Sequence, residues 1–185
     1  TSLHNCITCP KGSYCPEGKK NDCPDGTYQP YENKTSQSDC ITCPKGSYCQ
    51  QGIKKLCIKG TYQPYENKTS QSDCKKCPAG KFQDEEGKTS CKSCPKGHYC
   101  PSRNLQETIE PTKCDAGTYK NTKGGKSQLD CTKCPIGTYG EQEGGVSVAV
   151  CQKCPQGHYC PDQGTQKPKP CDKGTYKKTT GGKLK

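Results

Sequence analysis

The sequence has too few apolar residues to build an ordinary hydrophobic core. It contains no tryptophan, no methionine and one phenylalanine, and leucine, isoleucine, valine and phenylalanine together make up roughly 8% of its 185 residues. A chain with so little apolar surface does not usually offset the entropy that it loses on folding. This shortage alone predicts a disordered chain.

Long hydrophobic runs are missing as well. The longest apolar stretch is residues 148–150, far too short for a membrane span or for the core of a signal peptide. We therefore expect this segment to be soluble, with no membrane span. The chain starts in mid-pattern and ends at TYKKTTGGKLK, where comparable stretches run on to a cysteine, so we expect it to be a piece of a longer protein.

Motifs for catalysis are also missing. The sequence offers no combination of nucleophile, base and orienting residue, and no glycine-rich phosphate loop. We expect that the protein is not an enzyme, has no catalytic residue and needs no cofactor.

Cysteine, in contrast, is abundant, with 20 copies in 185 residues. A fraction this high marks a disulfide scaffold, in which crosslinks replace the missing core. Because a reducing cytosol would break such crosslinks, we expect an extracellular or cell-surface protein.

Half of the cysteines begin the same six-residue motif, Cys-x-x-Gly-x followed by an aromatic residue. Ten of the twelve aromatic residues occupy its sixth position, which is tyrosine everywhere except at Phe82. The motif supplies a cysteine that can be bridged, a glycine that lets the backbone bend or approach closely, and a ring to cover the crosslink. We call the first residues of the motifs openers: Cys9, Cys23, Cys43, Cys57, Cys77, Cys94, Cys114, Cys134, Cys154 and Cys171.

The motif belongs to an internal repeat. Residues 27–40, TYQPYENKTSQSDC, recur letter for letter at residues 61–74, a shift of 34, after which the period shortens and drifts. In short units another cysteine follows the aromatic residue at once, whereas in long units ten or more residues intervene. The predicted divisions are 1–22 (partial repeat), 23–56 (first full repeat), 57–76 (long unit), 77–93 (shortened unit), 94–133 (short loop and long unit), 134–153 (long unit) and 154–185 (short loop and truncated unit).

Each long unit is predicted to form a small β-hairpin. Its first arm is the TYQPY-like stretch, and its second arm is the stretch that leads to the next cysteine. Pro30 and Pro64 indicate short, irregular arms, and no segment has helical periodicity. The predicted fold is a small disulfide-rich one, an elongated tandem array of short irregular β-hairpins with essentially no helix. Turn residues with positive φ are expected at Asn33, Asn67, Gly87, Gly125, Gly145 and Gly182.

The other ten cysteines, which we call closers, alternate strictly with the openers. The alternative to bonding each opener with the next closer is an interleaved pairing, such as Cys40 with Cys49 and Cys43 with Cys57. We favour the sequential scheme because interleaving leaves only tight CxxC bridges at some joints, for example between Cys74 and Cys77. The sequential scheme leaves Cys6 and Cys171 unpaired. Its bridges are Cys9–Cys15, Cys23–Cys40, Cys43–Cys49, Cys57–Cys74, Cys77–Cys91, Cys94–Cys100, Cys114–Cys131, Cys134–Cys151 and Cys154–Cys160.

The units CPKGSYCPEG, CPDGTYQPYENKTSQSDCITCP and CPAGKFQDEEGKTSCKSCP resemble the cysteine-rich modules of the ephrin-receptor-like and tumour-necrosis-factor-receptor-like class. The resemblance extends over essentially the whole chain. It implies an elongated rod of stacked, disulfide-pinned hairpins, in which the opener closes the hairpin. The near-identical neighbouring repeats, rich in lysine, glutamine and threonine, also resemble surface proteins of ciliates and other protists.

The six CxxC pairs have the spacing of zinc half-sites or of redox pairs. We expect each pair to be only the joint between one closer and the next opener, because no dedicated histidine accompanies it. His98 and His158 occupy the variable position before the aromatic residue, and His4 lies outside the motif. The acidic residues 84–86 lack the alternating oxygen ligands of a calcium loop, so we interpret them as a charged hairpin tip. No metal site is predicted.

Two N-glycosylation sequons, Asn33-Lys34-Thr35 and Asn67-Lys68-Thr69, occupy equivalent predicted hairpin tips. We expect both asparagines to carry N-linked glycans. The alternative is that asparagine is present only for its turn geometry.

The net charge of +11 is compatible with anionic glycans, acidic surfaces or nucleic acid as partners, or with a solvated lysine-rich surface, which we favour. Nucleic acid is the least expected partner. The lysines are scattered, Arg103 is the one arginine, and the tyrosines are committed to the motif.

Function has to be predicted from the architecture, since the sequence offers no chemical site. The first hypothesis is a structural extracellular glycoprotein that forms a rod and builds a surface coat, stalk or filament, with copies of itself or other extracellular matrix or coat proteins as partners. The alternative is a ligand-binding or adhesive receptor ectodomain, in which the drifted units after Cys74 form the binding face.

Overall fold

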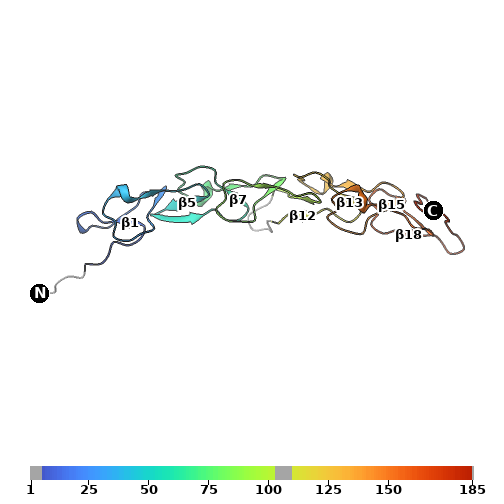
Figure 1. Ribbon diagram of the computed structural model, residues 1–185, viewed down its shortest axis with the longest axis horizontal. Coiled ribbons are helices and arrows are strands. Elements are labelled where there is room, and N and C mark those ends of the chain that lie inside the picture. Colours follow the sequence, from blue (N-terminus) through green and yellow to red (C-terminus); the bar gives the residue numbers. More distant parts are fainter. Residues whose placement is uncertain (1–5, 103–109, 185) are drawn as a thin grey trace. The chain divides into compact units, whose positions relative to one another are not determined.

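A computed structural model describes residues 6–102 and 110–184 of the chain. The contacts divide the chain into two compact units. Unit 1 is Thr1–Cys77 with Gln83–Cys91, and unit 2 is Pro78–Phe82 with Lys92–Lys185. Both units are built from short paired strands joined by loops (Figure 1).

The described residues form nine two-stranded antiparallel hairpins and no α-helix, which confirms the predicted array of small disulfide-rich hairpins. In unit 1 the pairs are β1 (Ser13–Tyr14) with β2 (Asn21–Asp22), β3 (Thr27–Tyr28) with β4 (Ile41–Thr42), β5 (Ser47–Gln50) with β6 (Ile53–Leu56), and β7 (Thr61–Tyr62) with β8 (Lys75–Lys76). In unit 2 they are β9 (Lys81–Phe82) with β10 (Lys92–Ser93), β11 (His98–Tyr99) with β12 (Thr112–Lys113), β13 (Thr118–Tyr119) with β14 (Thr132–Lys133), β15 (Thr138–Tyr139) with β16 (Gln152–Lys153), and β17 (His158–Tyr159) with β18 (Lys169–Pro170).

Single turns of 3-10 helix interrupt the longer loops. These turns were not predicted, because three residues are too few for a periodic pattern. They are η1 (Pro16–Gly18), η2 (Gln37–Asp39), η3 (Gln71–Asp73), η4 (Gln128–Asp130) and η5 (Val148–Val150).

All nine hairpins use one register. The fifth residue of the motif pairs with the residue just before the next opener, and the aromatic residue pairs with the one before that, as Thr27 with Thr42 and Tyr28 with Ile41. The predicted second arm was therefore wrong. The stretch that leads to closer Cys40 forms the 3-10 turn η2, and the returning strand β4 follows that cysteine. In the long units this returning strand is the two-residue spacer of the CxxC pair.

Successive motifs are joined by a repeated backbone step. The N–H of each later opener donates a hydrogen bond to the carbonyl of the preceding motif glycine, as Cys57 does to Gly46 at 2.9 Å. The N–H of the motif glycine donates to the carbonyl of the residue that follows the aromatic residue of the next motif, as Gly46 does to Gln63 at 2.8 Å. Between successive motifs among the described residues, the first bond occurs nine times and the second eight times. Each motif is therefore hydrogen-bonded to the motifs before and after it.

The motif glycine is required by close approach as well as by conformation. At Gly117, φ is +78°, and a Cβ atom would lie 2.2 Å from the carbonyl oxygen of Gly164 in a later loop. Because the contacted atom belongs to the backbone of Gly164, no side-chain rotation can relieve the contact. Close approach of a later loop therefore favours glycine at Gly46, Gly80, Gly97, Gly117 and Gly137, whereas at Gly157 and Gly174 nothing lies within 4 Å and only the positive φ favours it.

The predicted turn residues are right in three loops and shifted by one in the others. Asn33, Asn67 and Gly87 have positive φ, but Gly124, Gly144 and Gly181 have it in place of their successors Gly125, Gly145 and Gly182. The second glycine has another purpose. A Cβ atom at Gly125 would lie 2.6 Å from the carbonyl oxygen of His98.

The buried interior consists largely of disulfides. Among the described residues, fourteen apolar residues are buried, of which thirteen are cysteines and the other is Tyr48. Tyr48 packs with Cys57 and Cys74, which form the disulfide of the following hairpin rather than of its own. Where this ring covers a crosslink, it therefore links one hairpin to the next.

Candidate functional site

The nine disulfides of the structure follow the sequential scheme. Each joins an opener to the next closer, with Cα–Cα distances between 5.5 and 6.0 Å, and they leave Cys6 and Cys171 free. The two cysteines of every described CxxC pair therefore belong to different bridges or include a free cysteine. The bridges are Cys9–Cys15, Cys23–Cys40, Cys43–Cys49, Cys57–Cys74, Cys77–Cys91, Cys94–Cys100, Cys114–Cys131, Cys134–Cys151 and Cys154–Cys160.

The sequon asparagines lie on exposed turns whose backbone is held in place. Asn33 and Asn67 are exposed and have φ of 61° and 59°. The Asn33 N–H donates to the carbonyl of Cys9 at 2.9 Å, and the Asn67 N–H donates to that of Cys43 at 3.0 Å. Both side chains are therefore accessible on turns anchored to the opener of the previous motif, Cys9 or Cys43, a geometry that suits either glycan attachment or turn formation.

Buried glutamines next to the motif were missed by the sequence analysis. The Gln29 amide nitrogen donates to the carbonyl of Asp39, and its amide oxygen accepts from the N–H of Tyr31 at 3.0 Å. Gln63 makes the same two bonds one repeat later and is 0% exposed. Each glutamine therefore ties the two sides of its loop together. Glutamine directly after the motif, at positions 29, 63 and 83, was the available signal.

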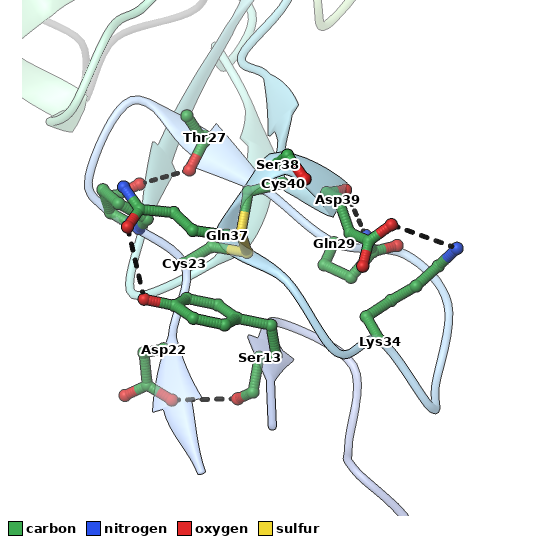
Figure 2. Close-up of a disulfide and its surroundings, with 12 residues drawn as sticks. Ser13, Asp22, Cys23, Thr27, Gln29, Lys34, Gln37, Ser38, Asp39 and Cys40 are labelled. Atoms are coloured by element: carbon green, nitrogen blue, oxygen red, sulfur yellow. Dashed lines mark hydrogen bonds and ion pairs between the residues drawn. A yellow bond between two sulfur atoms is a disulfide. The ribbon is translucent and has the colours of Figure 1, made fainter. Parts of the chain in front are cut away.

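Aspartate carboxylates cap the 3-10 turns by accepting hydrogen bonds from the N–H groups at the start of each turn. The Asp39 carboxylate accepts hydrogen bonds from the N–H groups of Ser36 at 3.0 Å and Thr35 at 3.2 Å, and these bonds lower the pKa of Asp39. Lys34 reaches the same carboxylate at 4.0 Å. Figure 2 shows Gln29, Lys34 and Asp39 beside the Cys23–Cys40 disulfide.

The same cap holds the equivalent turns of later hairpins. The pKa values of Asp73 and Asp130 are lowered too, chiefly by the N–H groups of Thr69 and Lys126. These carboxylates are turn caps, and their hydrogen-bonding capacity is used within their own loops.

The histidines and acidic residues do not converge on a common site. The Nδ1 atoms of His98 and His158 lie 2.9 and 3.0 Å from the carbonyl oxygens two residues earlier in their own turns. Residues 84–86 lie exposed before Gly87, and Glu85 pairs with Lys88 at 2.8 Å. No group of three or more metal-ligating side chains occurs within residues 6–102 and 110–184. His4 and Arg103 lie outside the described residues.

No helix among the described residues is long and apolar enough to cross a membrane. The hollows of unit 2 are shallow surface features. One of them, about 560 Å³, is lined by Gln128, Leu129, Thr132, Lys133 and Gln163 together with Thr118, Cys131 and Pro135. It contains no pair of groups suited to acid–base or nucleophilic chemistry.

Residues 65–107 and 104–151 each match the model of a family described as tyrosine-protein kinase ephrin type A/B receptor-like. No curated protein matches the chain. The matched segment, residues 65–151, contains three of the nine hairpins in full, namely β9–β10, β11–β12 and β13–β14.

Proposed function

From a chain that carries ephrin-receptor-like cysteine-rich modules, we propose a structural role: an extracellular glycoprotein whose repeats form a rod and build a surface coat, stalk or filament. The single observation that supports this proposal most is the constancy of the step between motifs. The same opener-to-glycine hydrogen bond occurs at every described step, and the same register occurs in every hairpin. A chain built by one repeated step extends by adding copies, which suits a spacer or a fibre.

The composition of the interior supports the same role. The described residues bury cysteine rather than a large apolar core, so each hairpin depends on its own bridge and on its neighbours. Such a protein tolerates changes in repeat number, because no central core has to be repacked. Disulfides at this density are typical of proteins from oxidising compartments, which supports an extracellular or cell-surface location.

Asn33 and Asn67 are the proposed attachment sites of N-linked glycans. Both lie on exposed turns at equivalent points of an exact repeat, so that the glycans would follow the period of the array. The intact mass of native protein, measured before and after treatment with an N-glycosidase, is expected to fall by two glycans. An unchanged mass would leave asparagine with a turn-forming role only.

Electron microscopy of native material tests the structural role. Periodic fibres or a regular coat are expected, with copies of the same chain or other extracellular coat proteins as neighbours. Dispersed particles that bind one partner saturably would instead support the second candidate, a ligand-binding or adhesive ectodomain. That candidate is favoured by one observation, the receptor-type family whose model matches residues 65–151.

A further inference from the structure

The positive charge of the chain is concentrated in unit 2. Its described residues include 15 lysines against seven aspartates and glutamates, whereas unit 1 has 12 lysines against ten acids. The described excess is therefore about +8 in unit 2 and about +2 in unit 1, by subtraction of these counts. A solvated surface with no particular partner gives no reason for this imbalance between units of the same design.

Three lysines of unit 2 occupy one position of the repeated hairpin. Lys113, Lys133 and Lys153 are the last residues of β12, β14 and β16, and each pairs with the fifth residue of its motif. All three are exposed, and none forms an ion pair with a carboxylate among the described residues. Since the register is the same in all three hairpins, this part of unit 2 presents one unpaired ammonium group per hairpin.

Packing holds the stems of two of these lysines. A Cβ atom placed on Gly164 would lie 3.3 Å from Cγ of Lys133, and one placed on Gly144 would lie 3.5 Å from Cγ of Lys113. The aliphatic stems thus lie on turns of the second hairpin further along the chain, while the charged ends remain in solvent. A positioned stem loses less conformational freedom when its ammonium group binds an anion.

The hollow beside Lys133 adds groups that recognise a sugar. Its lining offers the amide of Gln163 and the hydroxyl of Thr132, next to the apolar surface of Leu129, which is 95% exposed, while the Gln128 amide is bonded to Asp115 and Thr118. Amides and hydroxyls can bond sugar hydroxyl groups, and apolar surface can pack on the face of a sugar ring. The volume of about 560 Å³ is in the range of small-ligand sites.

We propose that Lys113, Lys133, Lys153 and the hollow beside Lys133 bind a linear sulfated polysaccharide. Regularly repeated ammonium groups complement a polymer with regularly repeated anionic groups, and lysine is a point charge without the planar geometry that arginine offers. Nucleic acid fits less well, because Tyr99, Tyr119 and Tyr139 are only partly exposed in their motif positions and are not free platforms for base stacking. This inference is independent of whether the protein forms fibres.

The test measures binding of the oxidised 185-residue chain to a fluorescent heparin decasaccharide by anisotropy, over a series of salt concentrations. The variant K113Q/K133Q/K153Q is compared with K123Q/K167Q/K178Q, which removes the same charge from exposed lysines of the same unit. The first variant is expected to bind at least about tenfold more weakly at physiological salt and to lower the salt slope by about two to three units, since each of the three lost anion contacts releases about 0.7–0.9 counterions. The second is expected to change the affinity less than threefold.

Two further measurements separate the sugar from its charge. Q163A is expected to weaken heparin binding about threefold without changing the salt slope, because it removes an uncharged contact. A decasaccharide stripped of its sulfates is expected to bind at least about tenfold more weakly. Equal losses in the two triple variants would overturn the proposal, as would duplex DNA of matched charge competing as well as heparin.

Discussion

Replacing Gly117 with alanine separates the two reasons for the motif glycine. At Gly117 φ is +78° and a later loop lies directly on the residue, whereas at Gly124 φ is +81° and nothing lies within 4 Å of a Cβ atom. G124A therefore tests the cost of the backbone conformation alone. G117A tests that cost together with the close approach.

The expected magnitudes follow from the contacts. A left-handed conformation costs an alanine about 1–2 kcal/mol, which both variants share. In G117A the new methyl group would meet the carbonyl oxygen of Gly164 at 2.2 Å, so the Gly164 loop has to move away. The bond from the Gly164 N–H to the carbonyl of Cys134, 2.8 Å long, is then lost, and leaving such a group unpaired costs about 1–3 kcal/mol.

Amide hydrogen exchange of the oxidised protein measures both costs locally. In G117A the exchange rates of the Cys134 and Gly164 amides are expected to rise by a factor at least about ten times larger than the rise at Gly124 in G124A. The reason is that 1.4 kcal/mol corresponds to a factor of ten. In G124A the reference amide is Gly124 itself, which donates to the carbonyl of Cys94 at 2.8 Å. Equal losses in the two variants would refute the claim that close approach selects glycine in the motif.

Three other predictions concern the loops and the bridges. Q63A should destabilise its loop by about 1–3 kcal/mol, because it leaves the N–H of Tyr65 and the carbonyl of Asp73 without partners. The control Q71A, which changes an exposed residue, should cost less than about 0.5 kcal/mol. Hydrogen exchange of the Tyr65 amide measures both costs, and equal rates in the two variants would contradict the role given to Gln63. Because hydrogen bonds lower the pKa values of Asp39, Asp73 and Asp130 in the folded state, the caps should be fully formed above about pH 4 and be lost as the pH falls through the lowered values; NMR of the Thr35 and Thr69 amides that instead showed loss near neutral pH would contradict this assignment. Full reduction should unfold the chain, since each bridge contributes about 2–4 kcal/mol and apolar residues are few; a hairpin pattern of protected amides that survived reduction would contradict the role given to the disulfides.

The sequence favoured sequential pairing of the cysteines, because openers and closers alternate and interleaving leaves only tight CxxC bridges at some joints, but it did not exclude the interleaved scheme. Non-reducing peptide mapping tests that pairing directly, and a peptide linking Cys43 to Cys57 would contradict it. The returning strands could not be derived in the same way. Ile41 and Thr42 carry no strand pattern of their own, and they pair with β3 only because Cys43 is bonded to the carbonyl of Gly26 in the preceding motif.

Some turn residues with positive φ were predicted one position too late, also because of contacts between hairpins. In a pair such as Gly124-Gly125, either glycine can adopt positive φ, so local preference does not decide between them. The contact with the carbonyl of His98, on another hairpin, requires the second glycine to have no side chain, and the first takes the turn conformation. Asn33 and Asn67 have no such competitor, and their turns were placed correctly.

Small-angle X-ray scattering of the oxidised chain tests the central claim most directly. A compact globule of this length would have a radius of gyration of about 16 Å. The proposed rod, in which hairpins contact those one or two places away along the chain, is expected to have a radius of gyration above about 30 Å and to give a linear cross-sectional Guinier region, which an unfolded chain does not give. A radius of gyration near 16 Å would contradict the account, because it would mean that the hairpins fold back on one another instead of extending by one repeated step.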